Sequence, residues 1–264
     1  MPFPLARPLA AAALCATSFA FTAGRVAPSI TRYRLDLSSK STVDLTPVGG
    51  AEQRSSLDIA GFLTITLTDS AGGRIMRAVL DSIVPDSTGA IPREAFDSAR
   101  GSSWHALVAK NGRISGLTPI DTTIATSQFA GIVAAFFPRV KPGARVGDTW
   151  TDTLDFTNSS DNGTTTARAV TNFQAVSMEK HEGVKALHIT SAFSSARTGT
   201  IPSPQGDLSI DGTGTGKGEY FVAADGRYLG GTSSETTTLT IVGGGAPAAI
   251  PVTATNTLTV SLVK

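Results

Sequence analysis

Apolar and hydroxyl-bearing residues alternate along most of this 264-residue chain, and no other feature limits its fold as strongly. Two runs show the apolar positions clearly: Leu57, Ile59, Leu63, Ile65 and Leu67, and then Val252, Ala254, Leu258, Val260 and Leu262. The positions between them carry mostly Thr, Ser and Asp. Because successive side chains of a strand point to opposite faces of a sheet, a period of two predicts half-buried antiparallel strands. Thr suits the solvent face of a strand, which accounts for 35 Thr and 26 Ser in the chain.

The charge of the chain excludes one class of function. Only 16% of the residues are charged, and the formal net charge is +1. Proteins that bind nucleic acid need a concentrated basic surface to replace the counterions of the phosphates. The composition therefore indicates no nucleic-acid partner. A hydrophobic fraction of 41% indicates a chain that folds around a core rather than a disordered one.

Turn residues and one helical pattern punctuate the strands. Asn111-Gly112 and Asp225-Gly226 predict hairpins with type I′ turns, because these residue types tolerate positive φ. One stretch repeats its apolar residues at spacings of three and four: Ile124, Phe129, Ile132, Val133, Phe136 and Phe137. This spacing predicts an amphipathic helix that ends at Pro138 and covers an apolar face of the sheet. The predicted fold is mainly β: a curved antiparallel sheet, or a barrel-like one, with a central covering helix.

The first 23 residues are typical of a signal peptide. Arg7 precedes an uncharged apolar stretch over residues 9–21, and Ser18-Phe19-Ala20 offers a small-x-small cleavage site. We therefore expect export to the periplasm or the extracellular space. Cys15, the only cysteine, lies in this segment, but Leu14 stands directly before it, which is the wrong order for lipid attachment. No later segment is apolar for long enough to predict a transmembrane helix.

An internal match at an offset of 114 residues predicts two pseudo-repeats. Residues 108–118, around Asn111-Gly112, match residues 222–232, around Asp225-Gly226. The domains expected from this match are a signal peptide (1–23), a first β repeat (24–121), a helix and linker (122–143) and a second β repeat (144–264). The alternative is that two Thr-rich hairpins look alike because they need the same turn residues. The sequence leaves open whether the repeats form one barrel or two domains, and it does not indicate the oligomeric state.

The start of the second repeat carries a resemblance. Residues 141–152 read Lys-Pro-Gly-Ala-Arg-Val-Gly-Asp-Thr-Trp-Thr-Asp and follow Phe137-Pro138. This segment resembles one that recurs in uncharacterised exported bacterial β-rich proteins. The resemblance covers about a dozen residues. It implies a protein of the bacterial envelope with an extended antiparallel sheet, and it implies no catalytic residue.

Residues that carry catalysis or bind metals are scarce. The three histidines, His105, His181 and His188, do not have the close spacing of a zinc site. The Gly-x-Ser-x-Gly motif of α/β-hydrolases is absent. Glycine recurs at every second position from Gly212 to Gly218, which indicates a strand with glycine on one face rather than a phosphate loop. The pattern therefore favours a non-enzymatic protein with no metal and no other cofactor, although residues from distant strands could still assemble a hydrolase site.

Four aromatic residues are the candidates for lining an apolar ligand pocket: Trp104, Trp150, Phe156 and Phe193. Core packing is the competing interpretation, since sheet cores and ligand cavities draw on the same inward positions. We expect an exported binding or scaffold protein of the bacterial envelope that accommodates a lipid or another apolar small molecule. The first alternative is a structural protein that meets a partner through its surface without a small ligand. The second is the hydrolase with a site assembled from distant strands.

Overall fold

The computed structural model describes residues 28–85, 96–120, 124–160, 163–204, 206–243, 245 and 248–264. Eleven strands lie in this part of the chain: β1 (Ser29–Asp44), β2 (Glu52–Ser70), β3 (Gly73–Pro85), β4 (Ser103–Val108), β5 (Ile114–Pro119), β6 (Thr149–Ser160), β7 (Gly163–His181), β8 (Val184–Ile201), β9 (Leu208–Ala223), β10 (Tyr228–Gly243) and β11 (Ile250–Leu262). A short 3-10 helix, η1 (Thr46–Val48), joins β1 to β2, and one α-helix, α2 (Ile124–Ala134), follows β5. The predicted signal peptide lies outside the described residues.

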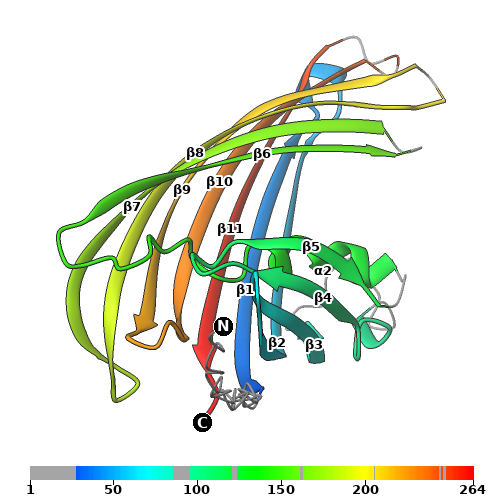
Figure 1. Cartoon of the computed structure of the whole chain (residues 1–264). Coiled ribbons are helices and arrows are strands. Elements are labelled where there is room, and N and C mark those ends of the chain that lie inside the picture. The colour runs from blue at the N-terminus through cyan, green and yellow to red at the C-terminus, as the bar shows by residue number, and fades with distance from the viewer. Residues whose placement is uncertain are drawn as a thin grey trace, which may run out of the picture.

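All eleven strands belong to one antiparallel sheet. Its order is β5-β4-β3-β2-β1-β11-β10-β9-β8-β7-β6, so β1 and β11 pair in the middle and β5 and β6 are the edges. Figure 1 shows that the sheet is strongly curved, and that the start of β1 and the end of β11 lie at its lower end. A mainly β fold with a curved antiparallel sheet is thus confirmed. The barrel-like alternative is wrong, since β5 and β6 do not pair and the sheet stays open.

The strand register confirms the alternation of the sequence. Leu35 of β1 lies between Gly61 of β2 and Val260 of β11, and the neighbouring pairs continue the same inner face. Leu63, Ile65 and Val260 point to this inner, concave face and are at most 5% exposed. The outer face of the same strands carries Thr, Ser and charged residues, as expected for a sheet with one solvated side.

The buried core occupies only one end of the sheet. We call this part, which carries all the buried hydrophobic side chains of the strands, the covered end. The strands continue beyond it as the projecting end, which consists of residues 38–44, 52–58, 153–160, 163–172, 192–201, 208–217, 232–243 and 250–257. In Figure 1 the projecting end forms the upper half of the sheet. Its inner face carries apolar side chains that no helix of the described chain covers, such as Leu239 and Val252.

The covering element differs from the prediction. The described part of the chain holds one short helix, α2, and an irregular segment over residues 135–148, which we call the strap. Phe129 and Ile132 of α2 pack on the core beside Leu35 and Leu80. The strap then crosses in front of the sheet to reach β6 (Figure 1). A central covering helix is therefore not supported, because Phe136 and Phe137, predicted to lie in it, belong to the strap.

The structure also corrects the repeat and the turns. The chain builds one continuous sheet, so two pseudo-repeats are not supported. The matching turns are real but are not type I′, since among their central residues only Gly112 and Gly226 have positive φ, +84° and +81°. Gly112 donates its backbone N–H to Ala109 O, and Gly226 donates to Ala223 O, both at 2.9 Å. Each hairpin is therefore a type I turn followed by a left-handed glycine.

Candidate ligand cavity

The strap is attached at both sides of the curved sheet. On the β4–β5 side, Val140 donates its backbone N–H to the carbonyl oxygen of Asn111 at 2.8 Å. On the β6 side, the indole Nε1 of Trp150 donates to the carbonyl oxygen of Arg139 at 2.8 Å, and the Arg139 guanidinium lies 3.6 Å from Asp152. Burial lowers the pKa of Arg139, and the Asp152 carboxylate opposes that shift. The strap thus bridges two distant flanks of one sheet.

A glycine lets the strap approach the β4–β5 turn. A Cβ at Gly112 would meet the carbonyl oxygen of Pro138 in the strap. The matching glycine of the β9–β10 turn, Gly226, has the same backbone conformation, but nothing lies within 4 Å of its Cβ position. Gly112 therefore serves two purposes, a left-handed turn and close packing against another segment.

Under the strap, at the covered end, lies a cavity of about 390 Å³. This volume falls within the range of roughly 300–1,000 Å³ typical of small-molecule sites. Its buried lining is apolar and comes from four strands: Val108 of β4, Leu187 of β8, Val222 of β9 and Tyr228 of β10. Phe137 and Val140 of the strap line the opposite side. The cavity therefore lies between the concave face of the sheet and the strap.

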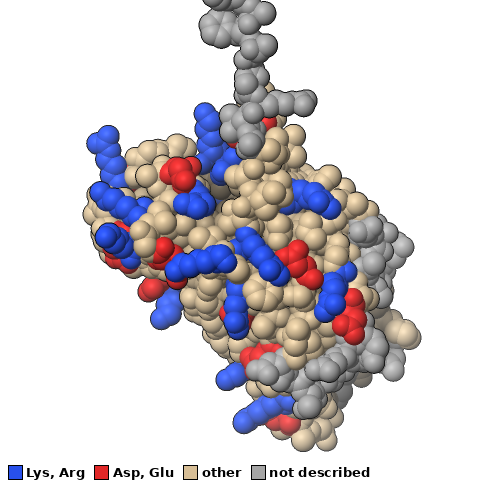
Figure 2. Space-filling model, turned by 90° about the horizontal axis from the view of Figure 1, so that it is seen from below, with Lys and Arg blue, Asp and Glu red and all other residues tan. Residues whose placement is uncertain are grey.

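Three basic side chains also line the cavity. Arg74, at the start of β3, is half-buried, while Lys110 of the β4–β5 turn and Lys141 of the strap are exposed. The ammonium of Lys141 lies 3.5 Å from the carboxylate of Asp148, which does not itself line the cavity. Figure 2, which views the molecule from below, shows blue Lys and Arg side chains spread over this end, with red Asp and Glu among them. The cavity thus combines an apolar interior with a basic rim.

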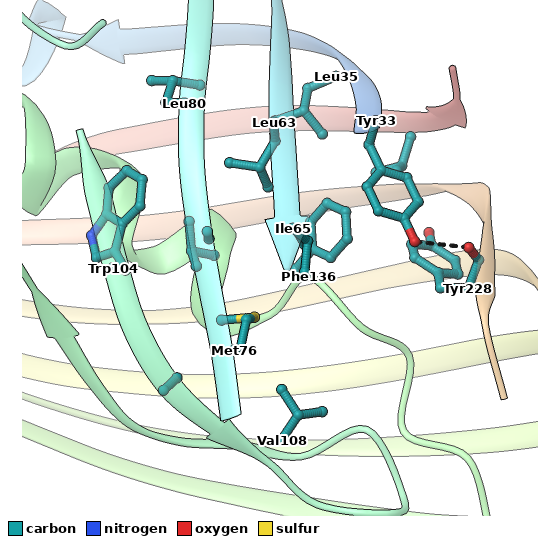
Figure 3. Packing of buried hydrophobic residues seen from close by; sticks show 14 of the residues in the cluster. Tyr33, Leu35, Leu63, Ile65, Met76, Leu80, Trp104, Val108, Phe136 and Tyr228 are labelled. Carbon is teal, nitrogen blue, oxygen red and sulfur yellow. Dashed lines mark hydrogen bonds between the residues drawn. The ribbon is translucent and has the colours of Figure 1, made fainter. Parts of the chain in front are cut away.

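An aromatic cluster packs behind the inner wall of the cavity at Tyr228. The hydroxyl of Tyr33 donates to the carbonyl oxygen of Tyr228 at 2.9 Å, which Figure 3 shows as a dashed line. The ring of Phe136 packs edge-on against Tyr33 and Tyr228, with centroid distances of 4.9 and 5.7 Å. Burial raises the pKa of both tyrosines, so their hydroxyls stay protonated at neutral pH. The wall is therefore neutral, and the charges of the cavity are those of its basic rim.

The aromatic residues predicted to line a pocket lie elsewhere. Trp104 is fully buried in the core, and Trp150 stacks on Phe173 with a centroid distance of 5.5 Å. Phe193 lies across the inner face of β9, where a Cβ at Gly216 would meet its ring. The side chain of Phe156 is outside the described part, although its backbone pairs with Ala167. None of the three described side chains lines the cavity, and their contact with a ligand stays a prediction.

Sequence reasoning missed the residues that do line it. Nothing in the alternation distinguishes Val108, Leu187 and Val222 from ordinary core positions of strands. Lys141 and Phe137 were each noted, but only as part of the linker and the helical stripe. One local feature of the sequence points to the strap: Phe137-Pro138 is followed by Lys141-Pro142-Gly143. Because proline cannot continue a helix and disfavours helical backbone at the residue before it, these residues predict an irregular segment after the helix.

His181 and His188 form no catalytic triad with their described neighbours. His188 Nδ1 lies 3.8 Å from Glu179, whose carboxylate accepts a 2.8 Å hydrogen bond from the Ser177 hydroxyl. In a Ser-His-acid triad the imidazole lies between the hydroxyl and the carboxylate, whereas here Glu179 lies between Ser177 and His188. The imidazoles of His181 and His188 both stack on the ring of Phe221. Their visible role is packing.

The described part of the chain holds neither a candidate metal cluster nor a helix suited to span a membrane. No group of three or more His, Cys, Asp or Glu residues there could hold a metal ion. Among the same residues, no helix combines the length and apolar character needed to cross a bilayer.

Another hollow, of about 560 Å³, lies at the projecting end. Unlike the cavity under the strap, it is lined by polar residues throughout, including Lys40, Glu52 and Arg54.

No protein-family model matches the chain, and no curated protein matches it significantly.

Proposed function

We propose that this chain is an exported, non-enzymatic binding protein of the bacterial envelope, and that it holds a lipid or another apolar small molecule under the strap. The observation that carries the proposal is the 390 Å³ cavity, whose sheet side is lined by Val108, Leu187 and Val222. Burying apolar ligand surface there contributes about 25 cal/mol per Å². The signal-like first 23 residues support export.

Binding is favoured over catalysis by the chemistry of the lining. The described side chains around the cavity are aliphatic, aromatic or cationic, and no Ser, Cys, His, Asp or Glu is among them. Hydrolysis by a side-chain nucleophile needs that nucleophile and a general base within hydrogen-bond reach. These residues instead form a surface that receives an apolar group.

A surface interaction without a small ligand remains the second proposal, because of the outer face of the projecting end. Register places Thr255, Thr236 and Thr215 side by side on β11, β10 and β9, and Thr253, Thr238 and Thr213 form the next row. All six side chains are exposed. Such rows of hydroxyls offer regular hydrogen-bond donors and acceptors to a partner surface.

Native mass spectrometry of the protein purified from its own host tests the first proposal. We expect a population carrying an additional mass that organic extraction identifies as a lipid or apolar metabolite. The variant Ala144→Trp fills the cavity from the strap, where Ala144 is only half-buried. It should lose the bound mass.

The matched control is Ala196→Trp. Ala196 is exposed on β8 and lies outside the cavity lining, so the same side chain should leave the bound mass in place there. Two results contradict the proposal: no bound small molecule in the unaltered protein, or equal retention by Ala144→Trp and Ala196→Trp. The first of these results would favour the surface-interaction proposal.

A further inference from the structure

The geometry points to a ligand class for the cavity: we infer that it selects single-chain amphiphiles with an anionic head group, either a carboxylate or a phosphate. This inference rests on the proposed binding function, because it needs an apolar chain inside the cavity. What it adds is the sign of the head group, which the apolar lining by itself does not determine.

The charges of the lining all have one sign. Arg74, Lys110 and Lys141 line the cavity, and no Asp or Glu does so in the described chain. Among the ion pairs between described residues, only Lys141 of these three has a partner, Asp148. Arg74 and Lys110 therefore leave positive charge available at the edge of an apolar space.

The three cations come from separate parts of the chain and converge only in the fold. Arg74 opens β3, Lys110 lies in the β4–β5 turn, and Lys141 lies in the strap. Register pairs Arg74 with Val108, so the guanidinium of Arg74 starts from the same inner face as a buried wall residue of the cavity. The strap brings Lys141 to the same opening, because Val140, the residue before Lys141, donates its backbone N–H to Asn111, the residue after Lys110. A head group at this opening would meet all three cations.

The chemistry of these side chains favours carboxylate and phosphate. A guanidinium presents two parallel N–H donors that match the two oxygens of either group, and lysine supplies a mobile point charge. Half-burial of Arg74 strengthens such a contact, since the surrounding dielectric is lower than that of water. A cationic head group would meet repulsion, and a neutral one would gain only the burial of its chain.

Isothermal titration calorimetry with four ten-carbon probes tests the inference on the full mature chain, at about pH 8 so that carboxylates are ionised. The probes are decanoate, decyl phosphate, decan-1-ol and decyltrimethylammonium, each below its aggregation concentration. We expect the two anions to bind and the cation to bind at least roughly tenfold more weakly, which is the effect of one charge-assisted contact. The stronger of the two anions identifies the head group as carboxylate or phosphate.

Variants separate the charge from the cavity. The double variant Arg74→Gln with Lys110→Gln removes the two cations that have no ion-pair partner among the described residues. Its Kd for each anion should rise by roughly ten- to a hundredfold, and its Kd for decan-1-ol by less than about twofold. The control with the same loss of charge is Lys40→Gln with Lys217→Gln, both exposed at the projecting end and outside the cavity lining. It should bind all probes like the unaltered protein.

The outcomes distinguish this inference from the proposed function. Retained decan-1-ol binding in the double variant shows an intact cavity, so a selective loss of the anions supports the inference. Unchanged anion binding in that variant, or a cationic probe that binds as well as decanoate, overturns the inference and leaves the proposed function standing. If none of the four probes binds the unaltered protein, the proposed function is wrong, and so is the inference that rests on it.

Discussion

The two ends of the sheet follow the same alternating pattern but differ in what covers them. At the covered end, α2 and the strap lie over the inner face, and Leu63, Ile65 and Met76 are at most 1% exposed. At the projecting end the same inner positions carry Leu239 and Val252, which are only half-buried and belong to no core cluster. Alternation by itself therefore gives a strand one apolar and one polar face. The apolar face becomes a core only where a second layer packs on it.

The two ends also differ in what holds neighbouring strands together: cross-strand pairing alone at the projecting end, and pairing plus burial at the covered end. Where no layer covers the sheet, backbone ladders and side-chain pairs hold the strands, as in the hydroxyl contacts of Ser41 with Ser55 at 2.6 Å and of Thr236 with Thr255 at 3.3 Å. Such cross-strand pairs contribute about 0.2–1 kcal/mol each. A covered strand gains more, because a fully buried leucine contributes about 1.5–3 kcal/mol. Three pairs of substitutions test this contrast and the contact of the strap with the sheet.

The largest effect is expected from leucine truncation at the two ends. Leu63→Ala, in the core, should lower the free energy of unfolding by about 3–5 kcal/mol, through lost burial and the remaining cavity. Leu239→Ala, at the projecting end, should lower it by about 1 kcal/mol, since its side chain is half-buried beside Gly212. Urea unfolding followed by circular dichroism measures both. Equal losses would show that the projecting end contains a core of its own.

The strap is tested by the two matching turns. Gly226→Ala should cost about 1–2 kcal/mol, because alanine is strained at positive φ. Gly112→Ala carries the same strain and also forces the new Cβ against Pro138, so it should cost about 1–3 kcal/mol more. It should also speed hydrogen exchange of the Val140 amide, whose bond to Asn111 fixes the strap. If both variants lose the same stability, the strap does not press on the turn.

Hydroxyl removal should give the smallest effect. Thr64, at the covered end, donates to the Asp81 carboxylate at 2.7 Å, and Asp81 also pairs with Arg32 at 3.2 Å. Thr64→Val should therefore cost about 1 kcal/mol. Thr236→Val, on the exposed outer face of the projecting end, should stay within about 0.5 kcal/mol. Chemical unfolding of the two variants side by side is the measurement. A large loss for Thr236→Val would mean that the hydroxyl rows stabilise the sheet.

The glycine stripe of β9 illustrates how far residue pattern reaches. Alternating glycines from Gly212 to Gly218 predicted a strand with one bare face, and β9 is such a strand. What fills that face was not predictable, because it comes from other strands. Leu239 covers Gly212, and the ring of Phe193 covers Gly216. A side chain on β9 at these positions would displace its neighbours, which is why glycine stands there.

Local residue pattern was enough for the strands, their inner and outer faces and the positions of both hairpins, though not for the turn type, since each depends on neighbours within a few positions. The open sheet, the short helix and the strap were decided by tertiary structure, because they depend on how segments far apart in the chain pack. The cavity belongs to this second group: Arg74, Lys141 and Val222 are separated by many residues and meet only when the sheet curves and the strap crosses it. Pattern assigns a residue to a face, and only packing decides whether that face becomes core, cavity or surface.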